Sequence, residues 1–137
     1  MMFSFLFIVL AAICNAVMDV CSHHYYRSIF HKYGFKMIWW NAELSWANKY
    51  IEGTPVFGRT YWLIFNIKII KPVQVTDAWH LFKMFMIIFI VLSIITYNGS
   101  MFMSDNFLIF LLDMLIYGCL WNCTFSLFYN RILKCNT

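Results

Sequence analysis

The stretch from Val75 to Tyr97 limits the fold more than any other part of the sequence. Its second half, Met84 to Ile95, has Ser93 as its only polar side chain, and the whole stretch is about as long as one bilayer crossing. Only 12% of the residues are charged, whereas a soluble domain carries about 25%. Too little polar surface is therefore available to cover a water-soluble globule. The sequence predicts an all-α, polytopic helical membrane protein that forms a single membrane domain, with three transmembrane helices at about residues 2–22, 77–97 and 107–129.

The first apolar run is expected to be a retained span rather than a removed signal peptide. A secretory signal begins with Lys or Arg, and this run has neither near its start. Ile13 precedes Cys14, where the cleavage site of a lipoprotein has a small residue. A removed signal is the minor alternative.

The connection between the first and second spans, about residues 31–75, is rich in aromatic and basic side chains. Trp and Tyr favour the membrane–water interface because a ring and a polar tip are both satisfied there. We therefore expect the connection to lie along the lipid surface. The apolar piece 60–70 is too short to span a bilayer, and its pattern leaves open an interfacial helix, a strand pair or a re-entrant segment.

Basic residues predict the orientation, because Lys and Arg accumulate on the cytoplasmic side. Most of them lie in or beside the connection and in the tail after residue 129, and none lies before Arg27 or in the short loop expected at about 98–106. The connection and the C-terminus are therefore predicted to be cytoplasmic, with the N-terminus outside. A crossing by residues 60–70 would overturn this assignment.

Polar residues of all three spans are expected at one depth near the cytoplasmic side. Asn15, Asp19 and His23 are spaced by four residues and form one helical stripe. Asp77 and His80 share a face at the start of the second span. The third span contributes one polar side chain at a similar depth, that of Asn122.

The functional interpretation of this group is a metal site. An aspartate and a histidine on one helix face supply ligands for zinc, iron or manganese, and facing helices can share one or two ions. The ligands would be Asp19, one of His23 and His24, Asp77 and His80, and Glu43 is a further candidate. A metal-bound water would then attack a lipid-borne ester or phosphate.

Ordinary structural roles are the alternative explanation for the same residues. Asp77 would cap its own helix, Asp19 would pair with Lys83 or Arg27, and the histidines would bond to backbone or headgroups. A proton or ion path is a third interpretation. Neighbouring helical residues lie about 100° apart, so only one of His23 and His24 is expected to face inward.

Several other residues are candidate components of a site. The aromatic stretch 38–50 either anchors the chain at the interface or forms a lid that brings Glu43, Asn48 and Lys49 toward the histidines, with Lys49 holding a phosphate headgroup. Asp113, inside the third span, is a functional candidate by default or is hydrogen-bonded to Tyr117 or Asn15. Gly118 and Cys119 form a small patch that would let another helix approach closely.

Composition excludes two other classes of protein. The five cysteines have no extracellular spacing pattern, so a disulfide framework is not expected. No basic run or basic domain exists, so nucleic-acid binding is not expected.

Three motifs resemble one group of proteins. Residues 15–19 (NAVMD), 45–50 (SWANKY) and 76–83 (TDAWHLFK) are similar to those of small uncharacterised membrane proteins of gut-type bacteria and their phages. The resemblance covers about residues 10–85 and implies no assigned activity. It does imply that Asp19, His24, the SWANKY piece and the DAWH piece belong to one pattern.

Three functions follow as hypotheses. The first is a membrane enzyme with a metal site that acts on a lipid headgroup. The second is a non-enzymatic subunit that packs against partner membrane proteins or other copies of itself. The third is a small channel-like or holin-like protein, for which the long aromatic connection is unusual.

Overall fold

The computed structural model describes residues 2–97 and 107–135. Within these residues, three helices are long and apolar enough to cross a membrane: α1 (Met2–His23), α5 (Ala78–Ile95) and α6 (Phe107–Leu127). Helix α6 continues into a π-helical turn, η7 (Phe128–Leu133). The predicted helical fold with three candidate spans is confirmed. The short loop expected at about 98–106 lies outside the described residues.

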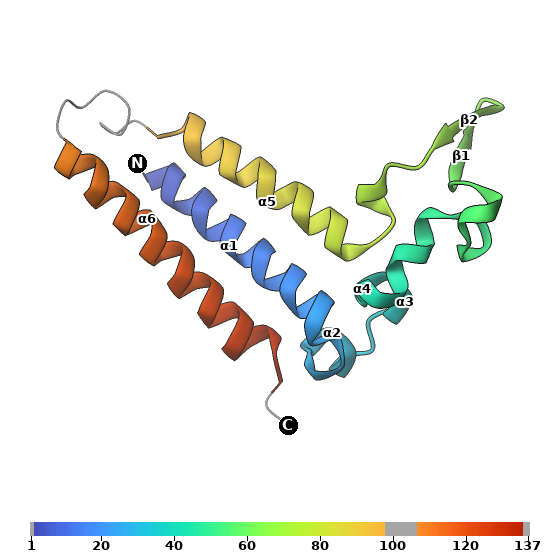
Figure 1. Ribbon diagram of the computed structural model, residues 1–137, viewed down its shortest axis with the longest axis horizontal. Helices are drawn as coiled ribbons and strands as arrows, with labels where there is room; N and C mark the ends of the chain where they lie inside the picture. The colour runs from blue at the N-terminus through green and yellow to red at the C-terminus, as the bar shows by residue number, and fades with distance from the viewer. Residues whose placement is uncertain (1, 98–106, 136–137) are drawn as a thin grey trace.

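Helix α1 is the central element, with α5 and α6 on either side of it (Figure 1). Within the 18 most apolar consecutive residues of each helix, 44% are buried in α1, against 11% in α5 and 6% in α6. The two outer helices therefore turn most of their apolar side chains outward. A bilayer satisfies such surface, whereas water does not.

Small side chains on α1 let the outer helices approach it. Ala11, Ala12 and Ala16 are fully buried, and small residues permit close contact between helix backbones in membranes. The small pair singled out from the sequence does not take part. Gly118 and Cys119 lie on an exposed part of α6, and a Cβ atom added at Gly118 meets nothing within 4 Å.

Buried hydroxyl groups join the three helices near the start of α1. The Ser4 hydroxyl donates to the Ser93 carbonyl at 2.8 Å, and the Ser93 hydroxyl donates back to the Ser4 carbonyl at 3.0 Å. The Tyr117 hydroxyl of α6 donates to Ser4 Oγ at 2.7 Å. One serine of α1 thus contacts both outer helices. Asp113 lies nearby and is nearly buried, and its carboxylate accepts from the Tyr97 hydroxyl rather than from Tyr117 or Asn15, the partners expected from the sequence.

Replacement of Ser93 by Ala is expected to loosen this junction. The change removes a buried hydroxyl that both donates and accepts between two helices, and such interhelical bonds contribute about 0.6 kcal/mol on average and about 1.7 kcal/mol at most. We expect the free energy of unfolding to fall by about 1 kcal/mol, measured by SDS titration in detergent micelles. Ser126→Ala, an exposed serine of α6, is the matched control, and equal effects of the two variants would contradict the role given to Ser93.

The connection between α1 and α5 consists of short elements. In chain order these are η1 (Tyr25–Arg27), α2 (Ile29–Lys32), α3 (Met37–Trp40), α4 (Ala42–Ser45), η2 (Trp46–Lys49), η3 (Ile51–Gly53), η4 (Pro55–Phe57), β1 (Tyr61–Ile64), β2 (Ile67–Ile70) and η5 (Val73–Val75).

An aromatic cluster centred on Trp40 attaches the first half of the connection to the bundle. The Trp40 ring stacks on Phe30 with ring centroids 4.1 Å apart, and it also contacts Phe35, Trp39 and Phe82 of α5. Stacked and edge-to-face pairs of this kind add stability beyond the apolar area that they bury. The cluster thereby fixes α3 and α4 against the start of α5.

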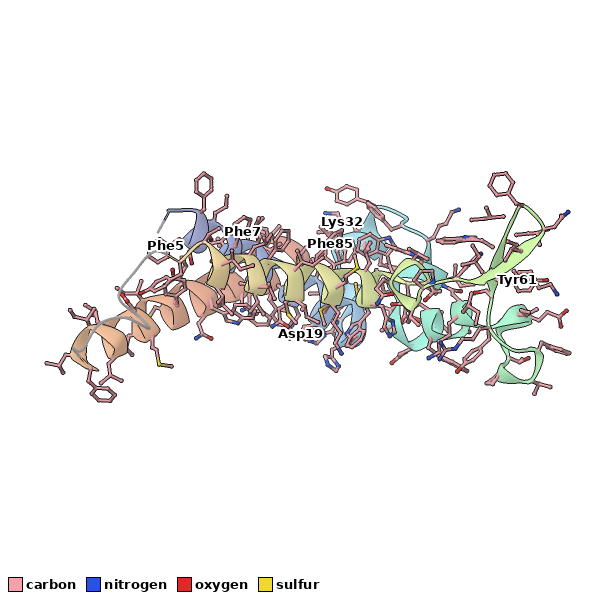
Figure 2. All side chains as sticks on the ribbon, turned by 90° about the horizontal axis from the view of Figure 1, so that it is seen from above. Phe5, Phe7, Asp19, Lys32, Tyr61 and Phe85 are labelled. Carbon is pink, nitrogen blue, oxygen red and sulfur yellow. The ribbon has the colours of Figure 1, made fainter. Side chains whose placement is uncertain are left out.

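Residues 60–70 form a strand pair, one of the three alternatives that the sequence left open. Strands β1 and β2 are antiparallel, and the turn residues Phe65 and Asn66 have φ angles of 50° and 64°, as a tight hairpin turn requires. All eight strand residues are exposed. The hairpin extends to the side of the bundle (Figure 1), and Tyr61 lies far along the molecule from Phe5 and Phe7 (Figure 2).

The tail after α6 returns to the start of the connection. The Cys135 amide donates to the Arg27 carbonyl, and Ser28 pairs with Lys134 in an isolated bridge. The basic residues of the tail and of the early connection therefore lie at the same end of the bundle. We call it the basic end.

Candidate functional site at the basic end of the bundle

Helix α5 begins with a buried acidic cap. Asp77 has an extended backbone, and its Oδ1 accepts from the His80 amide at 2.8 Å. Aspartate is a favoured N-cap because its carboxylate satisfies a free helical N–H group and complements the positive end of the helix dipole. The side chain is 1% exposed, so the cap is shielded from solvent.

The same carboxylate holds the imidazole ring of His80. Nδ1 of His80 lies 2.8 Å from Oδ2 and 2.9 Å from Oδ1 of Asp77, and the Thr76 hydroxyl donates to Oδ2 at 3.3 Å. A carboxylate accepts hydrogen bonds, so Nδ1 carries the proton and Nε2 is left for other partners. The His80 side chain is 33% exposed. The pair is thus a buried carboxylate that orients a partly accessible imidazole.

A pocket of about 350 Å³ lies beside this pair, which we call the helix-end pocket. Helix α1 contributes Met18, Asp19, Ser22 and His23 to its lining. The connection and α5 contribute Ala42, Ser45, Trp46, Asp77, Trp79 and His80. Four residues expected from the sequence to share a site, Asp19, His23, Asp77 and His80, therefore do line one pocket.

The two neighbouring histidines face different surroundings. His23 lines the helix-end pocket. The ring of His24 instead lies against Tyr129, with centroids 5.7 Å apart. Of the two histidines, His23 is therefore the one that faces the pocket, whereas His24 faces the end of α6.

His24 is expected to titrate below its ordinary range. Partial burial, and then the charges of Lys134, His23 and Arg27, lower the pKa of His24 from 6.5. Because the folded pKa is lower than the unfolded pKa, the unfolded chain binds this proton more readily. The contribution of His24 to stability is therefore complete above pH 6.5 and is lost as the pH falls toward the folded pKa.

NMR titration of the His24 ring measures this pKa directly. We expect Lys134→Met to raise it, because that change removes a nearby positive charge. A midpoint at or above 6.5 in the unaltered protein would contradict the prediction.

The aromatic stretch 38–50 contributes other residues to the pocket than the three expected from the sequence. Ser45 and Trp46 line the helix-end pocket, whereas Glu43, Asn48 and Lys49 do not. Glu43 is exposed. Nδ2 of Asn48 donates to the Ile38 and Thr76 carbonyls, at 2.6 and 3.0 Å, and thereby ties α3 to the start of α5. The Lys49 ammonium lies over the Tyr50 ring at 5.3 Å.

The other predicted polar residues lie outside the pocket. Nδ2 of Asn122 donates to the Gly118 carbonyl of its own helix and is exposed, so α6 adds no ligand there. Asn15 is half-buried, one helical turn before Asp19. Asp113 belongs to the buried junction at the opposite end of the bundle. Lys83 lies over Trp79, with its ammonium 4.8 Å from the ring centroid.

Asp19 does not form the ion pair with Lys83 or Arg27 that its ordinary structural role would require. Among the described residues, the ion pair formed within 4 Å is that of Asp77 and His80. Neither Lys83 nor Arg27 reaches the Asp19 carboxylate in the described part of the chain. Asp19 therefore brings an uncompensated acidic group to the wall of the pocket.

The predicted metal site is not supported by the geometry. Across residues 2–97 and 107–135, no group of three or more His, Cys, Asp or Glu side chains is placed to hold a metal ion. Asp77 serves instead as the cap of α5, because its carboxylate bonds to the amide and Nδ1 of His80. The zinc, iron or manganese site expected from Asp19, His23, His24, Asp77 and His80 is not assembled.

Six residues that line the pocket were not among the site residues predicted from the sequence, namely Met18, Ser22, Ala42, Ser45, Trp46 and Trp79. Ser22 lies three residues after Asp19, so the helical stripe of Asp19 and His23 could have found it. Ser45 and Trp46 are separated from both spans in the sequence, and their position depends on the packing of the aromatic cluster.

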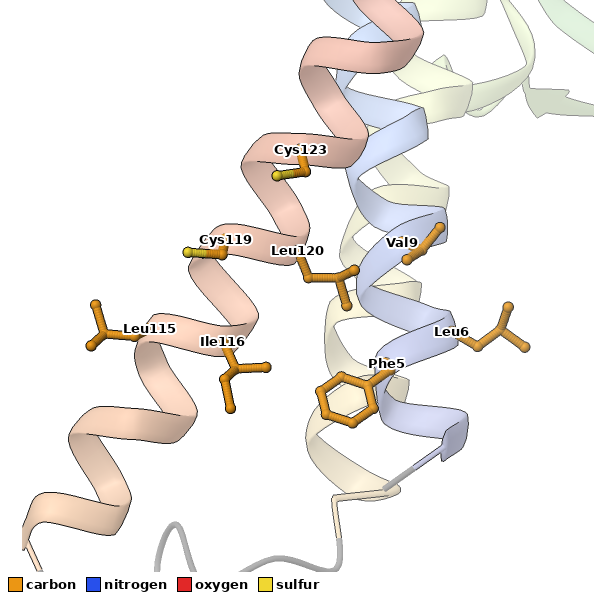
Figure 3. Close-up of a pocket in the computed structure, with 8 residues that line it drawn as sticks. All are labelled: Phe5, Leu6, Val9, Leu115, Ile116, Cys119, Leu120 and Cys123. Atoms are coloured by element: carbon orange, nitrogen blue, oxygen red, sulfur yellow. The ribbon is translucent and has the colours of Figure 1, made fainter.

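A larger groove lies between α1 and α6 and has a different character (Figure 3). Its volume is about 660 Å³. Its lining is apolar and consists of Phe5, Leu6 and Val9 of α1 and Leu115, Ile116, Cys119, Leu120 and Cys123 of α6. Cys119 and Cys123 project away from α1 in this view. It carries no ionisable group other than these free thiols.

No protein-family model, no curated protein and no solved structure matches this chain.

Proposed function

We propose that the protein is a multi-pass membrane protein whose helix-end pocket binds the polar headgroup of a membrane lipid and exchanges a proton with it through His80. The observation that carries this proposal is the Asp77–His80 pair at the wall of a pocket that also holds Asp19 and His23. The pocket is lined by residues of α1, of α5 and of the aromatic connection, and these two candidate spans and the connection meet at one end of the bundle (Figure 1). A lipid headgroup occupies that level of a bilayer.

The chemistry follows from the two nitrogens of His80. Asp77 fixes the ring by accepting from Nδ1, and it stabilises the positive charge that forms when Nε2 takes a proton. A buried carboxylate behind an accessible imidazole is the arrangement by which many enzymes orient a general base. His80 is therefore the residue to which we assign proton transfer.

The three motifs that resemble one group of membrane proteins support the same location. Asp19 comes from the first motif, Ser45 and Trp46 come from the second, and Asp77 and His80 come from the third. The motifs are far apart in the sequence, yet each places side chains in one pocket. We propose that the protein is related to that group of small membrane proteins.

The distribution of charge supports a cytoplasmic position for this pocket. The connection and the tail carry most of the basic residues and lie at the same end of the bundle. Basic segments favour the cytoplasmic side. A tag at the C-terminus is expected to be digested by protease in inverted vesicles and protected in intact cells, and the reverse pattern would overturn the orientation.

The proposed function is tested by following lipids. Purified protein in micelles is incubated with a total membrane lipid extract, and mass spectrometry measures the lipids retained and any new lipid species. We expect retained lipid with the unaltered protein and Glu43→Gln. His80→Gln is expected to retain lipid but to form none of the new lipid species that the unaltered protein forms.

Two results would overturn the proposal. The first is a failure to retain lipid under any condition. The second is a lipid profile that is identical in the unaltered protein and in His80→Gln, Asp19→Asn and Asp77→Asn. Metal analysis of the same samples decides whether an ion takes part, and stable co-purification of another membrane protein would favour the subunit hypothesis instead.

A further inference from the structure

We infer that the helix-end pocket selects an amino headgroup, so that its ligand is a zwitterionic phospholipid with a primary amine, of the phosphoethanolamine class. This inference rests on the proposed function and deepens it, because it names the class of lipid. It is based on two pockets that share His80, of which the helix-end pocket is acidic and the second pocket is basic.

The helix-end pocket has an acidic character. Asp77 is already bonded to His80, whereas Asp19 has no ion-pair partner among the described residues. A half-buried carboxylate at a pocket wall is costly unless a cation compensates it. A primary ammonium group supplies that charge and can also donate hydrogen bonds to the carboxylate and to Ser22.

An indole ring completes the cation site. Trp46 lines the pocket with 48% of its surface exposed, and indole is the best aromatic partner of an ammonium group. Trp79, at the start of α5, also lines the pocket, but the Lys83 ammonium already lies 4.8 Å from its ring centroid.

The second pocket is basic and shares His80 with the helix-end pocket. It also has a volume of about 350 Å³, and its polar residues are Gln74, His80 and Lys83. Lys83 is exposed and lies one helical turn beyond His80. An ammonium, an amide and an imidazole are suitable partners for a phosphate group.

The remaining wall of the second pocket leads along the lipid-facing side of α5. It is formed by Met84, Ile87 and Ile88, and both isoleucines are exposed. An acyl chain below a phosphate at Lys83 would lie on these side chains. One phospholipid could thus place its amine beside Asp19 in the first pocket and its phosphate and acyl chain beside Lys83 and Ile88 in the second, with His80 lining both.

Native mass spectrometry in micelles tests this inference with three dioleoyl lipids that carry ethanolamine, choline or glycerol on the phosphate. We expect the unaltered protein to bind the ethanolamine lipid about tenfold more tightly than the glycerol lipid, because a hydrogen bond between charged groups contributes about that factor. The choline lipid is expected to bind with intermediate affinity, since its methylated ammonium contacts the Trp46 indole but cannot donate to Asp19.

Variants separate the two parts of the site. Asp19→Asn is expected to abolish the preference for ethanolamine over glycerol. Lys83→Met keeps the length of the side chain and is expected to weaken both lipids about fivefold without changing the preference. Glu43→Gln, an exposed acid outside the pocket, is the matched control and is expected to leave all three affinities unchanged. Soluble phosphoethanolamine is expected to compete poorly, because it lacks acyl chains.

The outcomes distinguish the inference from the proposed function. Saturable lipid binding without preference for the amine, or a preference that survives in Asp19→Asn, would overturn the inference and leave the proposed function standing. Equal affinity for soluble phosphoethanolamine would overturn the acyl path along α5. Failure of all three lipids to bind would overturn both.

Discussion

Asp77→Ala is expected to lower the free energy of unfolding by about 2 to 4 kcal/mol, the largest effect of any single polar substitution discussed above. The change removes the N-cap of α5, which contributes about 0.5 to 2 kcal/mol. It also removes the partner of the His80 ring, and hydrogen bonds to charged groups contribute about 1.5 to 3 kcal/mol. SDS titration in micelles, followed by circular dichroism, measures the effect.

Asp77→Asn separates the two roles of this side chain. Asparagine caps helices about as well as aspartate, so much of the lost stability should return. It has no negative charge to stabilise a protonated His80, so lipid conversion should stay absent. Equal destabilisation by Asn and Ala would show that the carboxylate acts on stability through its charge rather than as a cap.

Ala16→Leu is expected to produce the second large effect, a loss of about 1 to 3 kcal/mol. Ala16 is fully buried at the packed face of α1. A longer side chain there must push α1 away from a neighbouring helix, and tightly packed interiors resist such shifts. Unfolding in SDS measures the loss of stability.

Gly118→Ala is the matched control, and we expect the opposite sign. No atom lies within 4 Å of an added Cβ at Gly118, and alanine favours a helix over glycine by about 1 kcal/mol. The variant should therefore be as stable as the unaltered protein or more so. A marked loss of stability in Gly118→Ala would show that another helix contacts this face in the membrane.

Much of the fold could be predicted from the sequence because the signal is physical and local. Long apolar runs with few charges have to be buried in lipid or in protein, whatever their neighbours are. The three spans were therefore found to within a few residues. The cap at Asp77 was found for the same reason, since capping depends on residues within one helical turn.

The candidate site was predictable in part. Helical spacing placed Asp19 with His23 and Asp77 with His80 on shared faces, and these four residues do line one pocket. Helical spacing cannot decide which side chains bond to each other. The sequence therefore suggested a shared metal, whereas the structure pairs Asp77 with His80 and leaves Asp19 without a cationic partner among the described residues.

The sequence by itself determined that the protein has three membrane-length helices and polar groups at their ends, because hydropathy and helical periodicity are properties of the chain alone. Only the tertiary structure decided that α1 is the central helix, that Trp46 lines the pocket and that His23 rather than His24 does so. These features depend on contacts between residues far apart in the chain. The alanines of α1 and the rings around Trp40 set the distances between elements, and no local pattern records those distances.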